Sequence, residues 1–551
     1  MNIQELIKDI VKKSVQKNMS AGVFPQAIIP DVILEVPPQK EYGDFATNFS
    51  MQSARVFHMP PKKIAEELVK QIDSDYLDKI EIAGPGFINF YLKPEIIYKQ
   101  LADVMEKDNK FGNLPLKNSG KIMVEYVSAN PTGPLHVGHG RGAAYGSALV
   151  NLLRAAGYYV RSEYYINDAG NQIDNLAASV NARYLELLGK KTEFPENGYH
   201  GQDIIDTAKR IINKTGTKYL DMPDKERLCV FKELALQEKL AVLKEDLNAF
   251  NVHFDNWFSE RTLHPDAVNS ACEILLQNKA MYEKEGAKWL RSTQYGDDKD
   301  RVVIRDNGVP TYLASDIAYH KNKFDRGFDK LIDIWGADHH GYVCRVKASI
   351  KALGFDPDRL DVLLLQMVSL YRNGELVKMS KRTGQSVTLA ELIEEVGTDA
   401  ARYFFIMRSL DSQLDFDLDL AKSESNENPV YYVQYAHARI CSIFRQAEEA
   451  GIHISEKVDL SLLTDDAEIT LIKKILSYPD EIELAARDYA PHRIANYLHD
   501  LAADFHSFYN KCRIIGVDLK LGQSRLALAG VVKNTIHHAL DILGISSPEK
   551  M

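Results

Sequence analysis

The sequence is poor in cysteine, and its cysteines do not cluster. Five cysteines are spread over 551 residues and none belongs to a Cys-x-x-Cys pair: Cys229, Cys272, Cys344, Cys441 and Cys512. This spacing argues against a disulfide framework and against a cysteine zinc site. We therefore expect reduced, buried thiols.

Long hydrophobic runs are also missing. No apolar stretch approaches the roughly 20 residues that a membrane helix requires. Residues 1–18 alternate charged and aliphatic side chains at helical spacing and contain no signal-peptide core. With 45% hydrophobic and 26% charged residues, the composition is that of an ordinary globular protein. We expect a cytoplasmic protein with no membrane segment.

The chain lacks an excess of positive charge as well. Its formal net charge is −10, which by itself gives no hint of nucleic-acid binding. Phosphate contacts depend on how basic residues are distributed over the surface more than on their total number. Any nucleic-acid site in this chain must therefore gather its positive charge locally.

The length excludes a single hydrophobic core. At about 150 residues per domain, 551 residues suggest about three or four units. We find no internal repeat and no low-complexity segment, and residues 109–120, rich in Gly, Asn, Pro and Lys, form a plausible linker. The patterns predict an N-terminal α+β domain over residues 1–116, an α/β domain over 117–427 and an all-α helical bundle over 428–551.

Periodicity predicts the elements of the N-terminal domain. Apolar residues from Ile3 to Val11 trace one helical face, and residues 62–72 follow two prolines as a second helix. Residues 80–83 and 87–92 are expected to be short strands on either side of a Gly-Pro-Gly turn.

The middle domain begins with a βαβ pattern. A buried strand over 122–128, a tight loop over 130–134, a helix over 135–156 ended by Gly157 and a strand over 160–166 predict a Rossmann-like parallel sheet. Further strands are expected at 302–305, 331–335 and 362–369, and residues 177–290 are expected to be a mostly helical insertion. Helices are predicted in the C-terminal bundle over residues 433–450, 469–476, 491–512 and 524–543.

Two histidines lie at the start of the helix that follows the first strand of the middle domain. In open parallel sheets, nucleotides bind at the carboxyl ends of strands, with phosphates near helix N-termini. His136 and His139 share one face of the first helical turn and can both donate to a phosphate, while Gly138 leaves room for an adenine against the backbone. The alternative is a helix start with two incidental surface histidines.

A second motif is basic. Lys378-Met379-Ser380-Lys381 follows a predicted hairpin with an Asn-Gly turn and precedes a helix whose Thr388 and Glu391 have capping-box spacing. Two lysines in such a loop can stabilise the charge that develops on a pyrophosphate leaving group. The alternative is a solvated basic turn.

Together, the two motifs, about 240 residues apart, resemble the two signatures of class I aminoacyl-tRNA synthetases. The wider run from Glu125 to His139 is specifically similar to arginyl-tRNA synthetases, as are the segments Tyr312–Tyr319 and Trp335–Gly341. Segments 42–48, 84–89 and 534–541 extend the resemblance over essentially the whole chain.

The resemblance implies an activity and its partners. It implies that L-arginine is activated with ATP and then transferred to the 2′-OH of the 3′-terminal adenosine of tRNA(Arg), with Mg²⁺ on the phosphates and no metal bound by the protein. It also implies that adenylate formation requires bound tRNA, and we expect a monomer.

It also assigns residues to roles. The expected catalytic residues are His136, His139, Lys378 and Lys381. The same four residues are expected to bind ATP together with Gly138, Gly336, Asp338, Met367, Met379 and Ser380. The expected arginine-binding residues are Glu125, Asn130, Tyr312, Asp316 and His339.

The residue types suit a guanidinium group. This planar cation is best held by carboxylates. Tyr312 and Asp316 are four residues apart and share a helical face, and Glu125 interrupts an apolar run, which is chemically odd unless it is paired. The alternatives are a structural salt bridge at Glu125 and a helix cap at Asp316. A carboxylate left unpaired by lysine or citrulline would be costly, so such a pocket need not rely on editing.

The tRNA-binding residues are harder to predict from the sequence than the other sites. Acidic residues outnumber basic ones in the C-terminal helices, so a basic-patch argument fails there. Interleaved aromatic and basic residues remain, on which single-stranded bases stack. We expect tRNA contacts at Tyr431, Tyr435, Arg439, Lys511 and Arg513, with core packing as the alternative for the tyrosines.

Two other functions stay open. A different class I synthetase would keep the nucleotide motifs and change the amino-acid pocket, although the missing cysteine/histidine zinc set speaks against the cysteinyl enzyme. A synthetase-like tRNA-binding protein without charging activity is the second alternative, but both signature motifs are intact.

Overall fold

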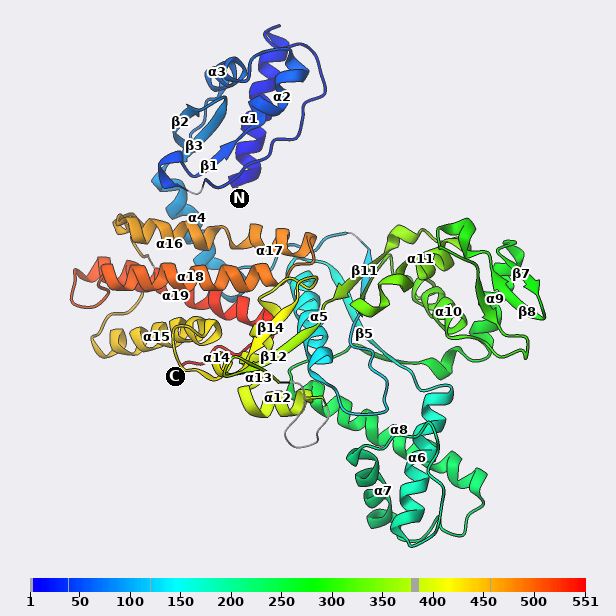
Figure 1. Cartoon of the computed structure of the whole chain (residues 1–551). Helices are drawn as coiled ribbons and strands as arrows, with labels where there is room; N and C mark the ends of the chain where they lie inside the picture. The colour runs from blue at the N-terminus through cyan, green and yellow to red at the C-terminus, as the bar shows by residue number, and fades with distance from the viewer. Residues whose placement is uncertain (1–2, 38, 119, 378–385, 456) are drawn as a thin grey trace. The chain divides into compact units, whose positions relative to one another are not determined.

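The computed structural model describes residues 3–37, 39–118, 120–377, 386–455 and 457–551 (Figure 1). They form two compact units. One combines Met1–Asp108, Gln446–Leu476 and Ser507–Val531, and the other combines Asn109–Arg445, Ser477–His506 and Val532–Met551. Among the described residues, no helix is long and apolar enough to cross a membrane.

The first unit begins with an α+β fold. An antiparallel sheet in the order β1-β3-β2 packs with helices around a core that includes Ile7, Phe49 and Phe90. Its elements are α1 (Ile3–Ser20), β1 (Phe45–Thr47), α2 (Phe49–Phe57), α3 (Pro61–Gln71), β2 (Leu77–Ala83), β3 (Phe87–Leu92) and α4 (Pro94–Lys107). The predicted first helix, second helix and strand pair are confirmed.

C-terminal segments complete the first unit. Helix α16 (Asp466–Leu476) packs against α4, and the Tyr98 hydroxyl donates to the Leu463 carbonyl at 2.9 Å. The helices α15 (Pro429–Glu449), α18 (His492–Lys511) and α19 (Leu519–Leu543) each contribute residues to both units. The three-domain division of the chain stays a prediction.

The second unit is built on a five-stranded sheet in the order β11-β10-β4-β5-β6, with every neighbouring pair parallel. This arrangement confirms the predicted α/β class. The strands are β4 (Lys121–Glu125), β5 (Tyr159–Ile166), β6 (Asn256–Ser259), β10 (Lys330–Gly336) and β11 (Leu360–Leu365).

Helices cover both faces of this sheet. Side chains alternate along a strand, so Val124 and Tyr126 face α5 (Val137–Ala155), while Met123 and Glu125 face α10 (Tyr312–Asp325). Helix α11 (Val343–Ala352) joins α10 on the second face, in a core that contains Met123, Leu331 and Ile350. Two helix layers around a parallel sheet are the expected way to bury such apolar strands.

Three sequence-based boundaries are wrong. The strand predicted over 122–128 ends at Glu125, because Val127 and Ser128 adopt positive φ angles of 67° and 40°, which cannot continue a strand. The strand predicted at 302–305 is β9 (Arg301–Ile304), in a separate antiparallel sheet with β7 (Met281–Lys284) and β8 (Ala287–Leu290). The strand predicted over 362–369 is two strands, β11 and β12 (Val368–Arg372), in different sheets.

The insertion predicted over 177–290 is mostly helical, as expected, but its second part also contains strands. Helices α6 (Asn171–Leu187), α7 (Gln202–Thr215) and α8 (Asp224–Ala249) enclose their own core around Tyr184 and Phe231 (Figure 1). The remainder holds α9 (Asp266–Gln277), the β7–β8 hairpin and β6, which returns to the main sheet as its edge strand. A four-residue strand gives too little periodicity to be recognised.

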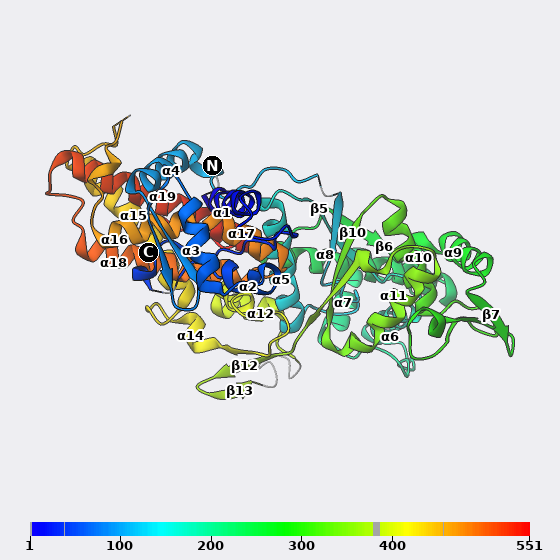
Figure 2. The same ribbon diagram turned by 90° about the horizontal axis from the view of Figure 1, so that it is seen from above.

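A small sheet follows β11. Strand β12 pairs antiparallel with β13 (Glu375–Val377) and parallel with β14 (Leu414–Asp417), and Figure 2 shows the two hairpin strands side by side. Asn373 and Gly374 have φ angles of 51° and 76°, so the predicted Asn-Gly hairpin turn is confirmed. Helices α12 (Leu389–Val396), α13 (Thr398–Ile406) and α14 (Leu418–Lys422) lie around this sheet.

The predicted C-terminal helices are confirmed as α15, α16, α18 and α19. A further helix, α17 (Tyr478–Arg487), was not predicted. It contacts α5, and the buried Tyr478 hydroxyl lies 2.8 Å from Nδ1 of His538.

Candidate active site

The candidate site lies at the carboxyl edge of the parallel sheet. The chain runs from β4 outward through β5 to β6 and then returns to β10 on the other side of β4. The strand order therefore reverses between β4 and β10, which is where open α/β sheets bind ligands. The His136 segment follows β4, and Gly336 ends β10.

The two histidines form an unusual cap at the start of α5. The Gly138 N–H donates to Nδ1 of His136 at 3.1 Å, and the His136 N–H donates to Nδ1 of His139 at 3.3 Å. The rings are stacked with centroids 3.6 Å apart. Because each Nδ1 accepts a hydrogen bond, each neutral ring carries its proton on Nε2 and can donate from that atom.

The environment keeps His139 neutral. Burial and the neighbouring His136 ring lower the pKa of His139 to about 4. A neutral pair of imidazoles can stand side by side at physiological pH without mutual repulsion, and it presents donors without adding net charge.

The segment that follows the lysine loop is anchored beside these histidines. The Val137 N–H donates to the Val387 carbonyl at 3.2 Å, and the Leu389 N–H donates to the Leu135 carbonyl at 2.8 Å. Thr388 caps α12 with Glu391 in the predicted capping box. The loop residues Lys378, Met379, Ser380 and Lys381 lie outside the described residues.

A row of carboxylates crosses the centre of the sheet. Asp333 on β10 is in register with Glu125 on β4, and Glu125 is in register with Glu163 on β5. Register partners in parallel strands point to the same face, so the three buried acids are neighbours on the face that α10 covers. Asn256 on β6 extends the row and donates to Glu163 at 2.6 Å.

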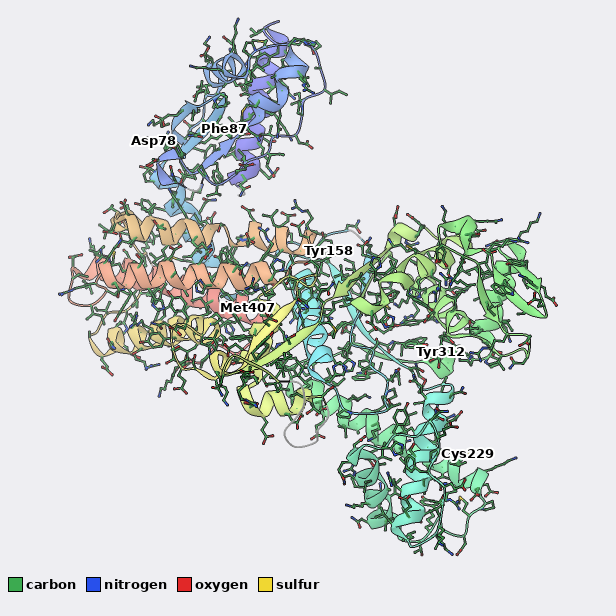
Figure 3. The ribbon with its side chains drawn as sticks, viewed as in Figure 1. Asp78, Phe87, Tyr158, Cys229, Tyr312 and Met407 are labelled. Carbon is green, nitrogen blue, oxygen red and sulfur yellow. The ribbon has the colours of Figure 1, made fainter. Side chains whose placement is uncertain are left out.

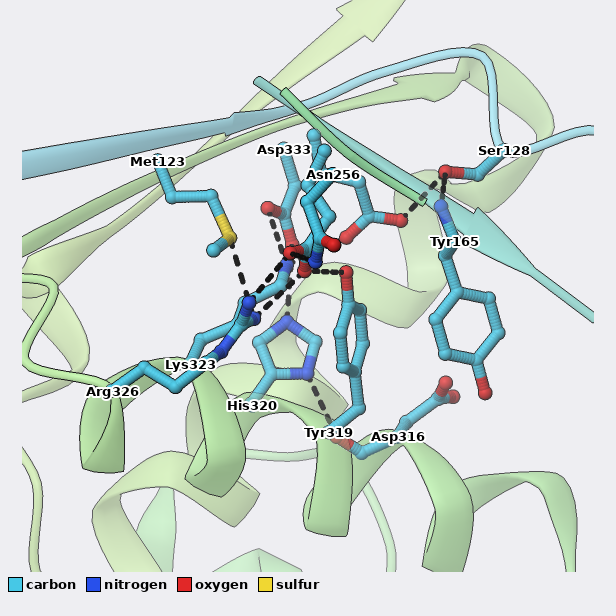
Figure 4. Close-up of polar contacts among 12 residues, drawn as sticks. Met123, Ser128, Tyr165, Asn256, Asp316, Tyr319, His320, Lys323, Arg326 and Asp333 are labelled. Carbon is cyan, nitrogen blue, oxygen red and sulfur yellow. Dashed lines mark hydrogen bonds and ion pairs between the residues drawn. The ribbon is translucent and has the colours of Figure 1, made fainter. Parts of the chain in front are cut away.

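Helix α10 and Arg326, the residue that follows it, supply the partners of this acidic row. Lys323 Nζ lies 2.6 Å from Glu125 Oε2 and 2.8 Å from Asp333 Oδ1, and His320 Nε2 lies 3.0 Å from Asp333 Oδ2. Arg326 binds both oxygens of Glu163, at 2.6 and 2.8 Å, and the Tyr319 hydroxyl donates to Glu163 at 2.7 Å (Figure 4). Sequence reasoning missed these partners and two of the three acids.

The strained turn after β4 positions Ser128. Val127 is β-branched and has a positive φ of 67°, a conformation that such residues rarely adopt. The turn brings the Ser128 hydroxyl to Glu125 Oε1, to which it donates at 2.9 Å, and Ser128 Oγ accepts from the Tyr165 N–H at 3.1 Å. Both oxygens of Glu125 are therefore held by protein donors.

Asp316 and Tyr312 occupy the N-terminal end of α10, one turn apart on one face, as predicted. Asp316 accepts a hydrogen bond from the hydroxyl of Tyr342. Burial raises the pKa of the Asp316 carboxyl, although the Tyr342 hydrogen bond opposes the shift. Tyr312 opens the helix with 58% of its surface exposed (Figure 3).

The electrostatics of the row differ from residue to residue. Burial raises the pKa of Glu125, with Lys323 acting in the opposite direction. Burial alone would also raise the pKa of Asp333, but Lys323 and His320 outweigh it and hold that pKa below its usual value. Lys323 stays charged, because Asp333 and Glu125 together outweigh its own burial and raise its pKa.

A further buried carboxylate lies nearby. Glu260 follows β6 in the short helix η3 (Glu260–Leu263), and Asp316 is among the charges acting on it. Burial raises the pKa of Glu260, which also lies 3.5 Å from Nε2 of His264. Sequence reasoning did not single out Glu260, because a lone acid between a short strand and a helix has no pattern.

The other predicted ligands lie on the loops of the same edge. Asn130 is exposed in the loop before α5, and Met367, between β11 and β12, is 72% exposed. Gly336 ends β10, and Asp338 and His339 belong to the segment that follows it, where His339 Nε2 lies 3.5 Å from Asp338 Oδ2. Among the described residues, no group of three or more His, Cys, Asp or Glu side chains is placed to hold a metal ion.

A buried arginine ties the histidine helix to the Met367 loop. The Arg141 guanidinium donates to the carbonyls of Gln366 (2.9 Å), Ser412 (2.9 Å) and Ser409 (2.8 Å). It therefore joins α5 to the start of β12, the strand that leads toward the lysine loop. Sequence reasoning missed this residue too.

The predicted tRNA-contacting residues fall into two sets. Tyr431, Tyr435 and Arg439 follow one another at four-residue spacing on a partly exposed face of α15. The two tyrosine rings are stacked with centroids 6.1 Å apart, and the Arg439 guanidinium lies 4.9 Å from the Tyr435 centroid. Lys511 and Arg513 are exposed and belong to the other compact unit.

Three family models cover most of the chain. Residues 1–92 match the arginyl tRNA synthetase N terminal domain, residues 100–409 match the catalytic domain of class I (R) tRNA synthetases, and residues 433–551 match the DALR anticodon binding domain.

Individual relatives agree with these models. An arginine–tRNA ligase of Carboxydothermus hydrogenoformans is 53% identical over 94% of each chain, and one of Shouchella clausii is 52% identical over the full length of both. A crystal structure of a putative arginyl-tRNA synthetase from Campylobacter jejuni is 39% identical, covers 84% of this chain and 100% of its own, and superposes with a TM-score of 0.78.

Proposed function

The chain belongs to the arginyl-tRNA synthetase family, and from that premise we propose which of its residues carry the reaction. Its activity is the ATP-dependent attachment of arginine to tRNA. The observation that carries the residue assignments is the set of buried carboxylates on the central strands, in the part of the sheet where the histidine segment follows β4.

The acidic groups bind the arginine side chain. Glu125 and Asp316 face the guanidinium, and the Tyr312 hydroxyl adds a hydrogen bond. More carboxylates than basic side chains surround this position: Glu125, Asp333, Glu163, Asp316 and Glu260 outnumber Lys323, Arg326, His320 and His264. A cationic substrate balances this excess, whereas a neutral one leaves it uncompensated. Asn130 and His339 bind the α-amino and carboxylate groups.

The histidines and the adjoining loops bind ATP. Nε2–H of His136 and Nε2–H of His139 donate to the phosphates, which supports a role in stabilising transition-state charge. Gly138 leaves room for the adenine, Gly336 and Asp338 face the adenosine, and Met367 presents its backbone to the base.

The lysine loop completes the phosphate site. Lys378 and Lys381 stabilise the pyrophosphate, with Met379 and Ser380 shaping the loop around ATP. The anchoring of Val387 and Leu389 on the histidine segment supports this proposal, since it fixes one end of the loop there. Mg²⁺ enters with the ATP phosphates, since it keeps several waters and needs few protein ligands.

The reaction proceeds in two steps. An oxygen of the arginine carboxylate attacks the α-phosphorus in line, the bond to the bridging oxygen breaks, and pyrophosphate leaves. The 2′-OH of the terminal adenosine of tRNA then attacks the adenylate carbonyl, loses its proton and displaces AMP. Positioning and electrostatic stabilisation carry the rate, and we assign no side chain as a nucleophile.

Stacking residues receive the tRNA. Tyr431, Tyr435 and Arg439 form an aromatic and cationic strip on α15 on which unpaired bases can stack. Lys511 and Arg513 contact phosphates. We further propose that the protein is a monomer and that it works in the cytoplasm, where translation uses the arginyl-tRNA that it makes.

A charging assay tests the function. The full-length chain is incubated with ATP, unfractionated tRNA and each proteinogenic amino acid in turn, with citrulline as a neutral isostere of arginine. We expect charging with arginine alone. Charging with another amino acid would make the chain a different class I synthetase, and tRNA binding without any charging would make it a binding protein.

A further inference from the structure

Lys323 is the most deeply buried cation of the acidic row, and the proposed reaction gives it no role. Its side chain is 0% exposed. Its ammonium group lies 2.6 Å from Glu125 Oε2, and 2.8 and 3.1 Å from the two oxygens of Asp333 (Figure 4). Its three protons therefore meet two carboxylates on two neighbouring strands, β4 and β10.

A buried ammonium is costly to desolvate, and apolar side chains of similar volume often stabilise a core equally well. Such a lysine is therefore weak evidence for stability alone. Its placement suggests a different use. Lys323 shares its helical face with Asp316, seven residues earlier, and with Tyr312, eleven residues earlier. One face of α10 thus carries Lys323 near its C-terminal end, and Asp316 and Tyr312, the residues proposed to face the substrate, near its N-terminal end.

The contacts of Glu125 leave one direction open. Lys323 binds Oε2, and the Ser128 hydroxyl donates to Oε1. Each carboxylate oxygen can accept more than one hydrogen bond, so Oε1 keeps capacity for a further donor while Oε2 is committed to the ammonium. The Lys323 contact therefore decides which oxygen is available to a substrate.

We propose that Lys323 is a positioning residue of the arginine site, which fixes the rotation of the Glu125 carboxylate and seats α10 so that Asp316 faces the same guanidinium. The proposal rests on the proposed function, because it presupposes that Glu125 and Asp316 bind arginine. Lys323 itself touches no reacting atom.

Other charged or titratable groups surround Glu125 and enter any pH dependence. They come from α10, β10 and β5, and they are His320, Tyr319, Arg326, Asp333, Glu163 and Tyr165. Among the described residues, Lys323 is the one fully buried cation in direct contact with Glu125. Its removal therefore favours the protonated form of Glu125, which binds a guanidinium poorly.

The experiment compares variants of the full-length chain in arginine charging. Lys323→Met is expected to raise the KM for arginine roughly 10- to 100-fold, while the KM for ATP stays within about twofold. Lys323→Arg keeps the charge and is expected to recover part of the loss. The acid limb of kcat/KM for arginine is expected to move to higher pH in Lys323→Met and to return in Lys323→Arg, a shift that a merely structural defect would not produce.

Lys239→Met is the matched control. Lys239 is buried to 5% exposure and paired with Asp203 between two helices of the insertion, away from the sheet. It is expected to lower stability without changing the KM for arginine. If Lys323→Met does not fold, the double variant Lys323→Met/Asp333→Asn leaves fewer unpaired acids, and the same rise and pH shift are expected.

A further variant separates the two proposals. If Glu125→Gln raises the KM for arginine but neither Lys323 variant does, the positioning role is refuted and the arginine site stands. If Glu125→Gln leaves that KM unchanged, the site assignment is wrong and the role of Lys323 is refuted with it. Equal losses for arginine and ATP, as in a damaged fold, would also overturn the proposal.

Discussion

At the scale of single residues, the main feature of the site is the balance between its buried acidic and basic groups. Three carboxylates in one row of a buried sheet repel one another, and burial in a low-dielectric interior opposes the ionisation of each, so their charges need nearby cations. Lys323 and Arg326 compensate two of these charges, and Asp316 and Glu260 add further acids. The site therefore has more acidic than basic groups before substrate binds. A guanidinium supplies the missing positive charge.

This imbalance predicts a pH dependence. The pKa of Asp316 is raised by burial, so this carboxyl takes up a proton at a higher pH than an ordinary aspartate does. Only the ionised form pairs with a guanidinium, so arginine binding is complete above the raised pKa and is lost as the pH falls through it. We expect the KM for arginine to rise as the pH is lowered from neutrality into the acid range, with little change in the KM for ATP.

The measurement is kcat/KM for arginine across that range in the parent chain and in Asp316→Asn. The amide cannot titrate, so the variant should have a higher KM and a flatter acid limb. An acid limb of the same steepness in both chains would contradict the role of Asp316.

A residue that breaks the pattern of its strand can be singled out from sequence, although its role as an arginine ligand stays a prediction. Glu125 was singled out because it interrupts an apolar strand, and it proves to be buried and paired. Asp333 interrupts an apolar strand in the same way and could have been found by the same criterion, whereas Glu163 follows the polar residues Arg161 and Ser162 and could not. Lys323 could not have been found from the sequence, because a lysine near the end of a helix is normally solvated. Only the register of β4 and β10 shows that two acids lie against it.

At the scale of elements, the close packing of α5 on the sheet determines where the two histidines at its start lie. Helix α5 lies directly on the sheet because it contains several glycines, and at Gly146 the helix backbone approaches the Tyr126 ring. The helix and its capping histidines were predicted from sequence, since a strand, a turn and a helical period are local signals. The early end of β4 and the split between β11 and β12 were not, because they depend on hydrogen bonds to residues distant in the chain.

Helix α5 offers a matched pair of glycines for a stability test. A Cβ at Gly146 would lie 2.3 Å from Cγ of Tyr126, whereas a Cβ at Gly142 would lie 3.4 Å from Leu365, an ordinary contact. Gly146→Ala is expected to destabilise the unit by about 1–3 kcal/mol through overpacking. Gly142→Ala should be neutral or stabilising by up to about 1 kcal/mol, because alanine favours helix.

Thermal unfolding of the two variants and the parent chain measures the difference. We expect a lower apparent Tm for Gly146→Ala and an unchanged or higher one for Gly142→Ala. Equal shifts would show that the approach of α5 to the sheet is looser than described.

At the scale of the whole molecule, chain order explains the position of the site. Residues from β4, α5, α10 and the β10–β12 region converge because the sheet reverses its order between β4 and β10. The α/β class and the helical C-terminal segments were predictable from periodicity. The distribution of the C-terminal helices over both compact units was not, since sequence patterns define helices and not which neighbours they pack against.

The family membership predicts that activation depends on tRNA. We expect negligible arginine-dependent ATP–pyrophosphate exchange until tRNA is added, because part of the binding energy of tRNA is used to complete the site. Exchange is measured with and without tRNA, and with tRNA whose 3′-terminal ribose has been oxidised. The oxidised tRNA cannot accept arginine, so it separates activation from transfer. Robust exchange without tRNA would refute the prediction.

The most direct test of the central claim is the pair of KM values, for arginine and for ATP, in the variant Asp316→Ala. Removing one partner of a buried charge pair costs about 2–5 kcal/mol, which is roughly thirtyfold or more in affinity. We predict a loss of that size for arginine and a change within about twofold for ATP, with Tyr342→Phe, which removes the hydroxyl that donates to Asp316, giving a smaller loss in the same direction. Equal losses for the two substrates would contradict the guanidinium site.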